Sequence, residues 1–292
     1  MPSDNLKSYL HLHLIVFIWG FTAVLGALIS LDAVPLVWYR MLLAVGFMAL
    51  YILLTKTSVK VPKKTVIAFL FAGLVIALHW LTFFKAIKVS NISVTLACLS
   101  TGAFFTSFLE PLLTGKKIVL YEVFFGLLVV VGLGIIFKVE GHYLEGILLA
   151  LSSAFLSALF SVINGKFARQ YNPAVISLYE VFGGVCFISL YLLCTGSFDR
   201  SFFTISASDW LYLGILSSVC TAYAFIASVK VMKFLTPYTV MLTINLEPIY
   251  GIILAVLVFH EKEKMSPAFY IGACIILCTV ILNGIIKYKK SR

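Results

Sequence analysis

A few ionisable side chains lie inside segments that otherwise have the composition of membrane hydrocarbon. The stretch "HWLTFFKAIKVSN", residues 79–91, contains His79, Lys85 and Lys88, and Glu247 lies in the middle of another apolar run. An ionisable side chain inside a lipid-buried helix is costly, so it usually faces a water-filled cavity or an ionic partner. These residues therefore indicate either a transport pathway through the bilayer or helix ends at its surface.

Glu247 is the strongest candidate for chemistry. It falls on one helical stripe with Thr236, Thr243 and Tyr250. A polar stripe facing lipid would be costly, so we expect it to line an interior cavity, where Glu247 binds a substrate ammonium group or carries a proton. The alternative is that Glu247 pairs with a lysine or caps a helix broken at Pro248.

Other charged residues allow a functional and a structural interpretation. His79 has an ordinary pKa of about 6.5, which suits a proton relay, but a neutral histidine bonded between helices is an equal alternative. Lys85 either contacts an anionic substrate group or extends to the membrane surface. Arg40 lies inside the second apolar run, where it either pairs with Glu180 or clamps a substrate.

Aromatic and sulfur-containing residues give weaker signals. Trp19 and Tyr223 could supply aromatic walls for an organic substrate, although each taken singly is more often a packing residue. The six cysteines lie in apolar runs without paired spacing, so we expect buried packing residues rather than disulfides or metal ligands. The sequence contains no nucleotide-binding loop, nucleophile elbow or metal-ligand motif, which predicts no cofactor and no ATP drive.

The composition sets the class of protein. The 292 residues are 62% hydrophobic and 12% charged, whereas a soluble domain is roughly half apolar and a quarter charged. Such a chain has too little polar surface for a water-soluble globule, which predicts an all-α integral membrane protein in a lipid bilayer. The net charge of +10 comes from short basic runs between apolar segments. That pattern is typical of cytoplasmic loops, so we do not expect a nucleic-acid partner.

Apolar runs long enough to cross a membrane recur along the chain. The first is too long for a cleavable signal and has no small-residue cleavage site. The basic loops place both termini in the cytoplasm of a multi-pass protein of the cell (inner) membrane. We predict ten transmembrane helices, at residues 10–30, 34–54, 66–88, 92–113, 118–138, 144–165, 173–194, 209–230, 236–259 and 266–286.

The two halves of the chain resemble each other. "FFKAIKVSN" from residue 83 falls on "SVKVMKFLT" from residue 228 at a shift of 145 residues. At a shift of 140, Arg40 falls opposite Glu180, and at 138, Pro35 falls opposite Pro173. The two "LEP" triplets lie in different registers, so Glu110 and Glu247 are not equivalent.

An odd number of spans in each repeat has a topological consequence. The second copy must enter the membrane the other way up, which predicts two inverted five-helix repeats, residues 1–138 and 139–292. Inverted repeats are typical of secondary transporters, which bind their substrate near the midplane and rock one repeat against the other.

Several short motifs resemble a known family. They are Trp19-Gly20, Pro35 with Arg40, "FFKAIKVS" from residue 83, Pro248 followed by "LVFHEK" from residue 257, and Gly272. In order and spacing these resemble the EamA-type permeases of the drug/metabolite transporter superfamily. The resemblance implies outward transport of small metabolites, often amino acids or toxic compounds, from a central cavity. The chain departs from the family at Ala103, where the family tends to proline, and at Gly115-Lys116, where it tends to an acidic residue.

The sequence as a whole predicts a secondary transporter. We expect an exporter of small organic metabolites, such as amino acids or drug-like compounds, working by alternating access as a monomer or homodimer. Proton antiport through Glu247 or His79 is one option. The alternative is an intramembrane enzyme, with His79, Glu247 and Lys85 converging, or a sensory membrane protein, but neither accounts for the repeat.

Overall fold

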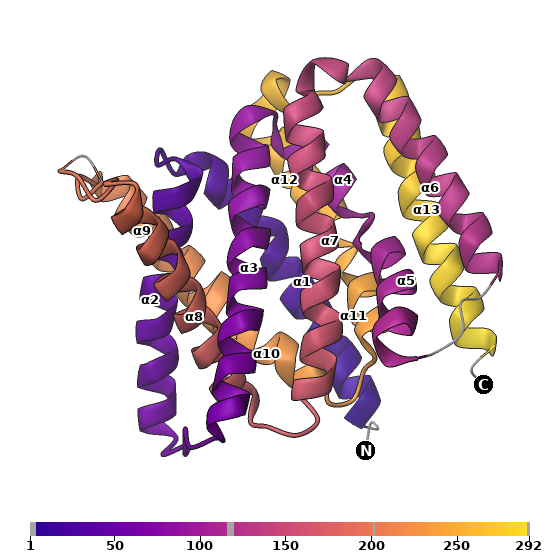
Figure 1. Ribbon diagram of the computed structural model, residues 1–292. Coiled ribbons are helices and arrows are strands. Elements are labelled where there is room, and N and C mark those ends of the chain that lie inside the picture. Colours follow the sequence, from indigo (N-terminus) through magenta and orange to yellow (C-terminus); the bar gives the residue numbers. More distant parts are fainter. Residues whose placement is uncertain (1–3, 116–119, 201, 291–292) are drawn as a thin grey trace.

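The computed structural model describes residues 4–115, 120–200 and 202–290, and this part of the chain is helical without any strand (Figure 1). The first half contains α1 (Asp4–Leu28), α2 (Ala33–Leu54), α3 (Lys63–Val89), α4 (Ile92–Leu99), α5 (Gly102–Thr114), α6 (Leu120–Val139) and the short η1 (Gly141–Tyr143). The second half contains α7 (Leu144–Phe167), α8 (Pro173–Cys194), α9 (Ala207–Ser217), the π-helical η2 (Ser218–Tyr223), α10 (Ala224–Val231), α11 (Pro237–Ile244), α12 (Glu247–Phe259), η3 (His260–Glu263) and α13 (Pro267–Lys290).

The described helices have the length and composition of membrane spans. Eight stretches qualify: Leu6–Leu28, Ala33–Leu54, Lys63–Val89, Ile92–Thr114, Gly141–Phe167, Pro173–Cys194, Ala207–Val231 and Pro237–Glu263. Two further stretches, Phe124–Val139 and Pro267–Thr279, are apolar but shorter. The predicted all-helical architecture is therefore confirmed for the described residues, and these helices are long and apolar enough to cross a membrane. The count of ten stays a prediction, because the fifth expected span begins outside the described residues.

The helix bounds repeat along the chain. The pair α4 and α5, with two residues between them, recurs as α11 and α12 at a shift of 145 residues in each of its four bounds. Helices α2 and α8 correspond at a shift of 140 in both bounds. The structure therefore favours the alignment that puts Arg40 opposite Glu180 over the one that puts Pro35 opposite Pro173.

The fourth span of each half is broken rather than continuous, which corrects the expected helices 92–113 and 236–259. The break before α12 is explained by Pro248, the second residue of that helix. Proline has no N–H, and its ring hinders the preceding turn. Before α5 there is no such proline. Instead, Ser100 Oγ donates to the carbonyl of Ala97 (2.6 Å) and Thr101 Oγ1 to that of Cys98 (2.8 Å). Such side-chain bonds compete with continued helix geometry, so the same break forms although Ala103 replaces the family's proline.

The helices of one half pack mainly on those of the other. Helix α3 lies along α7 and α8, and α5 packs on α7 as α12 packs on α1 (Figure 1). Gly73 of α3 is so close to α8 that an added Cβ would lie 2.2 Å from the carbonyl oxygen of Glu180, a contact that only a small residue permits. Helices α6 and α13 lie side by side at one edge, and the two chain ends lie on the same face.

Candidate functional site

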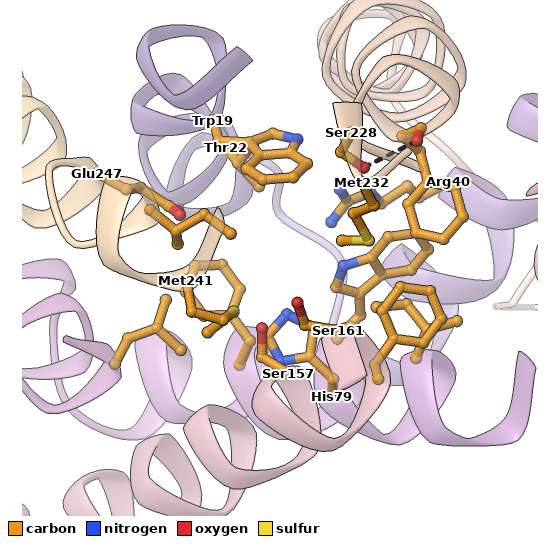
Figure 2. Close-up of a pocket in the computed structure, with 17 residues that line it drawn as sticks. Trp19, Thr22, Arg40, His79, Ser157, Ser161, Ser228, Met232, Met241 and Glu247 are labelled. Carbon is orange, nitrogen blue, oxygen red and sulfur yellow. Dashed lines mark hydrogen bonds between the residues drawn. The ribbon is translucent and has the colours of Figure 1, made fainter. Parts of the chain in front are cut away.

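A cavity of about 80 Å³ lies between the two halves of the chain (Figure 2). It has room for several waters and is smaller than the roughly 300–1,000 Å³ of a typical organic-ligand site. The cavity in this structure is therefore too small for a typical organic ligand. The lining residues are Trp19, Thr22, Arg40, Ile76, His79, Trp80, Phe83, Leu99, Ser157, Phe160, Ser161, Phe225, Ser228, Met232, Met241, Ile244 and Glu247.

Arg40 is the cation of this cavity. Its side chain is 2% exposed, and its guanidinium carbon lies 4.0 Å from the centre of the Trp80 ring, a favourable cation–π distance. Nε donates to Thr221 Oγ1 (2.7 Å), and Thr221 in turn donates to the carbonyl of Leu216, five residues back in the π-helical turn. Among the described residues, Nη1 has no hydrogen-bond partner. Arg40 is thus fixed on one edge and free to bind on the other.

Glu247 supplies the carboxyl group of the cavity and is the first residue of α12. The break before α12 places its carboxylate at a helix N-terminus, where backbone N–H groups favour negative charge. Figure 2 shows Glu247 and Arg40 on opposite sides of the cavity. The ion pairs of the described residues lie elsewhere, at Glu140 with His142 and Glu261 with Lys264. The site therefore presents a carboxyl group and a guanidinium group to a ligand between them.

His79 lines the cavity and is also bonded between helices. Its Nδ1 lies 2.9 Å from the carbonyl oxygen of Ser153 on α7. The same Nδ1 lies 2.8 Å from Ser153 Oγ, so the ring donates to the carbonyl or accepts from the hydroxyl according to its tautomer. Trp19 is held in a similar way, because its Nε1 donates to the carbonyl of Cys220 (3.1 Å) while its indole lines the cavity. Both residues combine a structural bond with a place on the cavity wall.

The structure places two other candidates on the outside of the bundle. Lys85 is exposed and lines a separate groove of about 1,090 Å³ formed by α2, α3 and α8. Tyr223 is 44% exposed, and its hydroxyl lies 2.9 Å from His11 Nε2. Neither lines the cavity, which corrects their expected placement; at the outer surface, their expected role in binding a substrate stays a prediction.

Thr243 and Tyr250 do not line the cavity either. Thr243 Oγ1 donates to the carbonyl of Thr239 (3.0 Å), and the Tyr250 ring packs edge-on against Phe17. The predicted stripe through Thr243, Glu247 and Tyr250 assumed one continuous helix. The break between α11 and α12 separates Thr243 from Glu247. Tyr250 lies on the same helix as Glu247 but packs against α1 instead of the cavity.

The expected pairing of Arg40 with Glu180 is also wrong. Arg40 bonds Thr221, whereas Glu180 Oε1 accepts a hydrogen bond from Asn164 Nδ2 (3.0 Å). The two residues are equivalent in the two halves, yet they take partners on different helices.

Sequence reasoning missed most of the neutral residues of the cavity. The repeat carried a signal for some of them, because positions related by a shift of 145 line it together. Trp80 and Phe225 form one such pair, and Leu99 and Ile244 another. Thr22, Ser157 and Ser161 had no distinguishing signal, since small polar residues in a span are also typical of helix packing.

Two carboxylates join the halves on the face opposite the chain ends. Glu263, 6% exposed, accepts from the amides of Ile92 (3.0 Å) and Ser93 (2.9 Å) at the start of α4. Asp209 at the start of α9 accepts from the amide of Ser30 (2.8 Å) and from its hydroxyl (2.5 Å). Charged acceptors make strong hydrogen bonds, so this face is closed by specific contacts between the halves.

Comparison with known proteins accounts for this architecture. The model of the EamA-like transporter family matches residues 6–138 and again residues 144–285. The chain belongs to the EamA-like transporter family. An "Uncharacterized transporter" of Archaeoglobus fulgidus is 25% identical over 292 residues, covering 96% of this chain and 98% of the relative. A solved structure described as "Crystal structure of protein" matches with a TM-score of 0.71 at 16% identity, covering 98% and 99% of the two chains.

The family and the relative make the protein a membrane transporter. The solved structure supports the fold alone. The family match also agrees with the expectation of a transporter rather than an enzyme.

Proposed function

We propose that this protein is a secondary transporter that exports small organic metabolites, such as amino acids or drug-like compounds, by alternating access. The observation that carries the proposal is a cavity between the two halves with Arg40 and Glu247 on opposite walls (Figure 2). A planar guanidinium suits a substrate carboxylate, and the Glu247 carboxylate suits an ammonium group. Trp80 and Phe225 supply apolar wall for the rest of the substrate.

The two halves, residues 1–138 and 139–292, act in this proposal as inverted repeats. Their support is the shared helix bounds and the packing of α5 on α7 and α12 on α1. In such carriers the site lies near the midplane, and one repeat rocks against the other to expose it on alternate sides. One chain encloses the whole cavity, so both a monomer and a homodimer could bind substrate.

The orientation follows from charge. The loops between α2 and α3 and between α7 and α8 lie on the same face as the chain ends (Figure 1). They carry Lys56, Lys60 and Arg169, as expected for cytoplasmic loops. We therefore place this face in the cytoplasm of the cell membrane. The contacts of Glu263 and Asp209 then close the outer side, and they must open for export.

The test is exchange in proteoliposomes. Purified protein would be reconstituted with a radiolabelled mixture of the proteinogenic L-amino acids inside, and efflux measured with and without the unlabelled mixture outside. A carrier predicts saturable efflux that external substrate accelerates. Efflux equal to that of protein-free liposomes, from protein shown to be folded, would contradict an amino-acid carrier, and efflux that never saturates would indicate a channel.

A further inference from the structure

A buried polar row extends away from the cavity along α7 and α8. Glu180 and Asn164 are both fully buried, and Asn164 Nδ2 donates to Glu180 Oε1 (3.0 Å). Ser161 lies three residues before Asn164, and Ser177 three residues before Glu180, so each is about one helical turn away. Because α7 and α8 run in opposite directions, the two serines lie on opposite sides of the central pair. Ser161 lines the cavity, and Ser177 lies toward the face of the chain ends.

Four oxygen atoms of this row have no hydrogen-bond partner among the described residues. They are Ser161 Oγ, Asn164 Oδ1, Ser177 Oγ and Glu180 Oε2. A buried polar atom without a partner costs free energy, and most folded proteins avoid it. A purely structural contact between helices would leave its polar atoms hydrogen-bonded. Four oxygen atoms without partners in one row are therefore unlike such a contact.

Glu180 also has no counter-charge within the described part of the chain. Among the titratable groups on the helices packed against α8, Arg40 of α2 bonds Thr221 and His79 of α3 bonds Ser153. Lys230 of α10 is exposed at its helix end, and Lys166 of α7 donates to the carbonyl of Leu113. Burying an ionised carboxylate without a partner is expensive. A carboxyl that takes up a proton avoids that cost.

The packing around Glu180 favours a small ligand. Helix α3 is so close at Gly73 that no side chain fits between it and the Glu180 backbone. The row has hydroxyl, amide and carboxyl groups about one helical turn apart, and chains of polar side chains inside membrane proteins are typical of proton relays.

We propose that Glu180 is a proton-binding site of the carrier, linked to the cavity through Asn164 and Ser161 and to the cytoplasmic face through Ser177. The inference rests on the proposed transport function. A proton entering the row forms an O–H bond at Glu180, and that bond breaks when the proton leaves toward the opposite side. The coupling carboxyl is then separate from Glu247, which stays available to the substrate.

The variant that tests this is Glu180→Gln, which keeps the acceptor for Asn164 and removes the titratable group. In proteoliposomes with a pH gradient, wild-type protein should concentrate the labelled amino-acid mixture against its gradient. E180Q should exchange the mixture at a rate close to that of wild type but fail to concentrate it. The control is Glu145→Gln on α7, an exposed carboxylate, which should leave both activities unchanged. Accumulation by E180Q at the level of wild type would overturn the proposal, as would accumulation that only a sodium gradient drives.

A measurement on purified protein separates this proposal from the transport function. Infrared difference spectra between acidic and alkaline buffer should show the C=O stretch of a buried carboxylic acid, absent from E180Q and present in E145Q. If E180Q does not fold, Glu180→Asp should shift that band. A band unchanged in these variants overturns the proton site, whatever the exchange assay shows. Absence of exchange in wild type would overturn the proposed substrate class. The infrared spectra would then decide on their own whether Glu180 binds a proton.

Discussion

The pair α4 and α5 and the pair α11 and α12 have equivalent helix bounds and different chemistry. In each pair, a side chain caps the first helix by accepting from its third amide. Asn91 accepts from the amide of Val94 (2.8 Å), and Thr236 accepts from that of Thr239 (3.2 Å). Both pairs break at equivalent residues and restart after two. The first residue after the break is Gly102 in one half and Glu247 in the other. The repeat thus sets the geometry of the site, and single substitutions within it supply the charge.

The contacts of these pairs with the rest of the chain differ as well. The start of α4 is held by Glu263 from the other half, in addition to its own Asn91 cap. The position equivalent to Glu263 at a shift of 145 is Ile118, which lies outside the described residues and has no polar side chain to offer. Symmetric helices therefore meet an asymmetric set of contacts.

The largest expected effect is that of Glu247→Gln. Loss of a charge that faces a bound ligand costs about 2–5 kcal/mol, or roughly a 30-fold or greater loss of affinity. Amino-acid exchange should fall accordingly, whereas Gly102→Ala at the equivalent position should retain most activity, because the added methyl meets only the flexible end of Met241. Equal losses in both variants would show that the break matters and the carboxylate does not.

A smaller and more local effect is expected for Glu263→Gln. Replacing a charged acceptor at a helix N-terminus should cost about 1–2 kcal/mol of local stability. Hydrogen exchange measured by mass spectrometry should quicken in peptides of α4 and stay constant in those of α11. The matched control is Glu261→Gln, because that carboxylate is exposed and bonds Lys264 at the surface. Faster exchange in both helices would mean that Glu263 stabilises the whole helix bundle rather than the start of α4 alone.

The smallest effect is expected for Ala103→Pro, which gives the first half the proline of the second. Ala103 is the second residue of α5, where a helix amide has no partner within its own helix. A proline there should change the free energy of unfolding by less than about 1 kcal/mol. Thermal unfolding of detergent-solubilised protein checks this. A large loss of stability would show that the two breaks differ more than their shared bounds suggest.

The fold was largely predictable because membrane spans leave a simple signal. Runs of apolar residues gave the spans, and the repeat at a shift of 145 anticipated the bounds of α11 and α12 from those of α4 and α5. The break before α5 was not predictable from proline, since it depends on the hydroxyls of Ser100 and Thr101 bonding backward.

The candidate site was predictable where a residue was costly in lipid. Arg40, His79 and Glu247 stood out as charges in apolar runs, and all three line the cavity. Lys85 gave the same signal but is long enough to reach the surface. The partner of Arg40 was not predictable, because the π-helical turn that presents Thr221 has no sequence signature.

The most direct test of the central claim is competition for exchange by matched analogues. Proteoliposomes exchanging a labelled L-amino acid would be challenged with the same compound unlabelled, with its amine that lacks the carboxylate, and with its acid that lacks the ammonium group. A site with Arg40 on one wall and Glu247 on the other predicts that only the intact amino acid competes well. Equal competition by all three would contradict binding between these two charges.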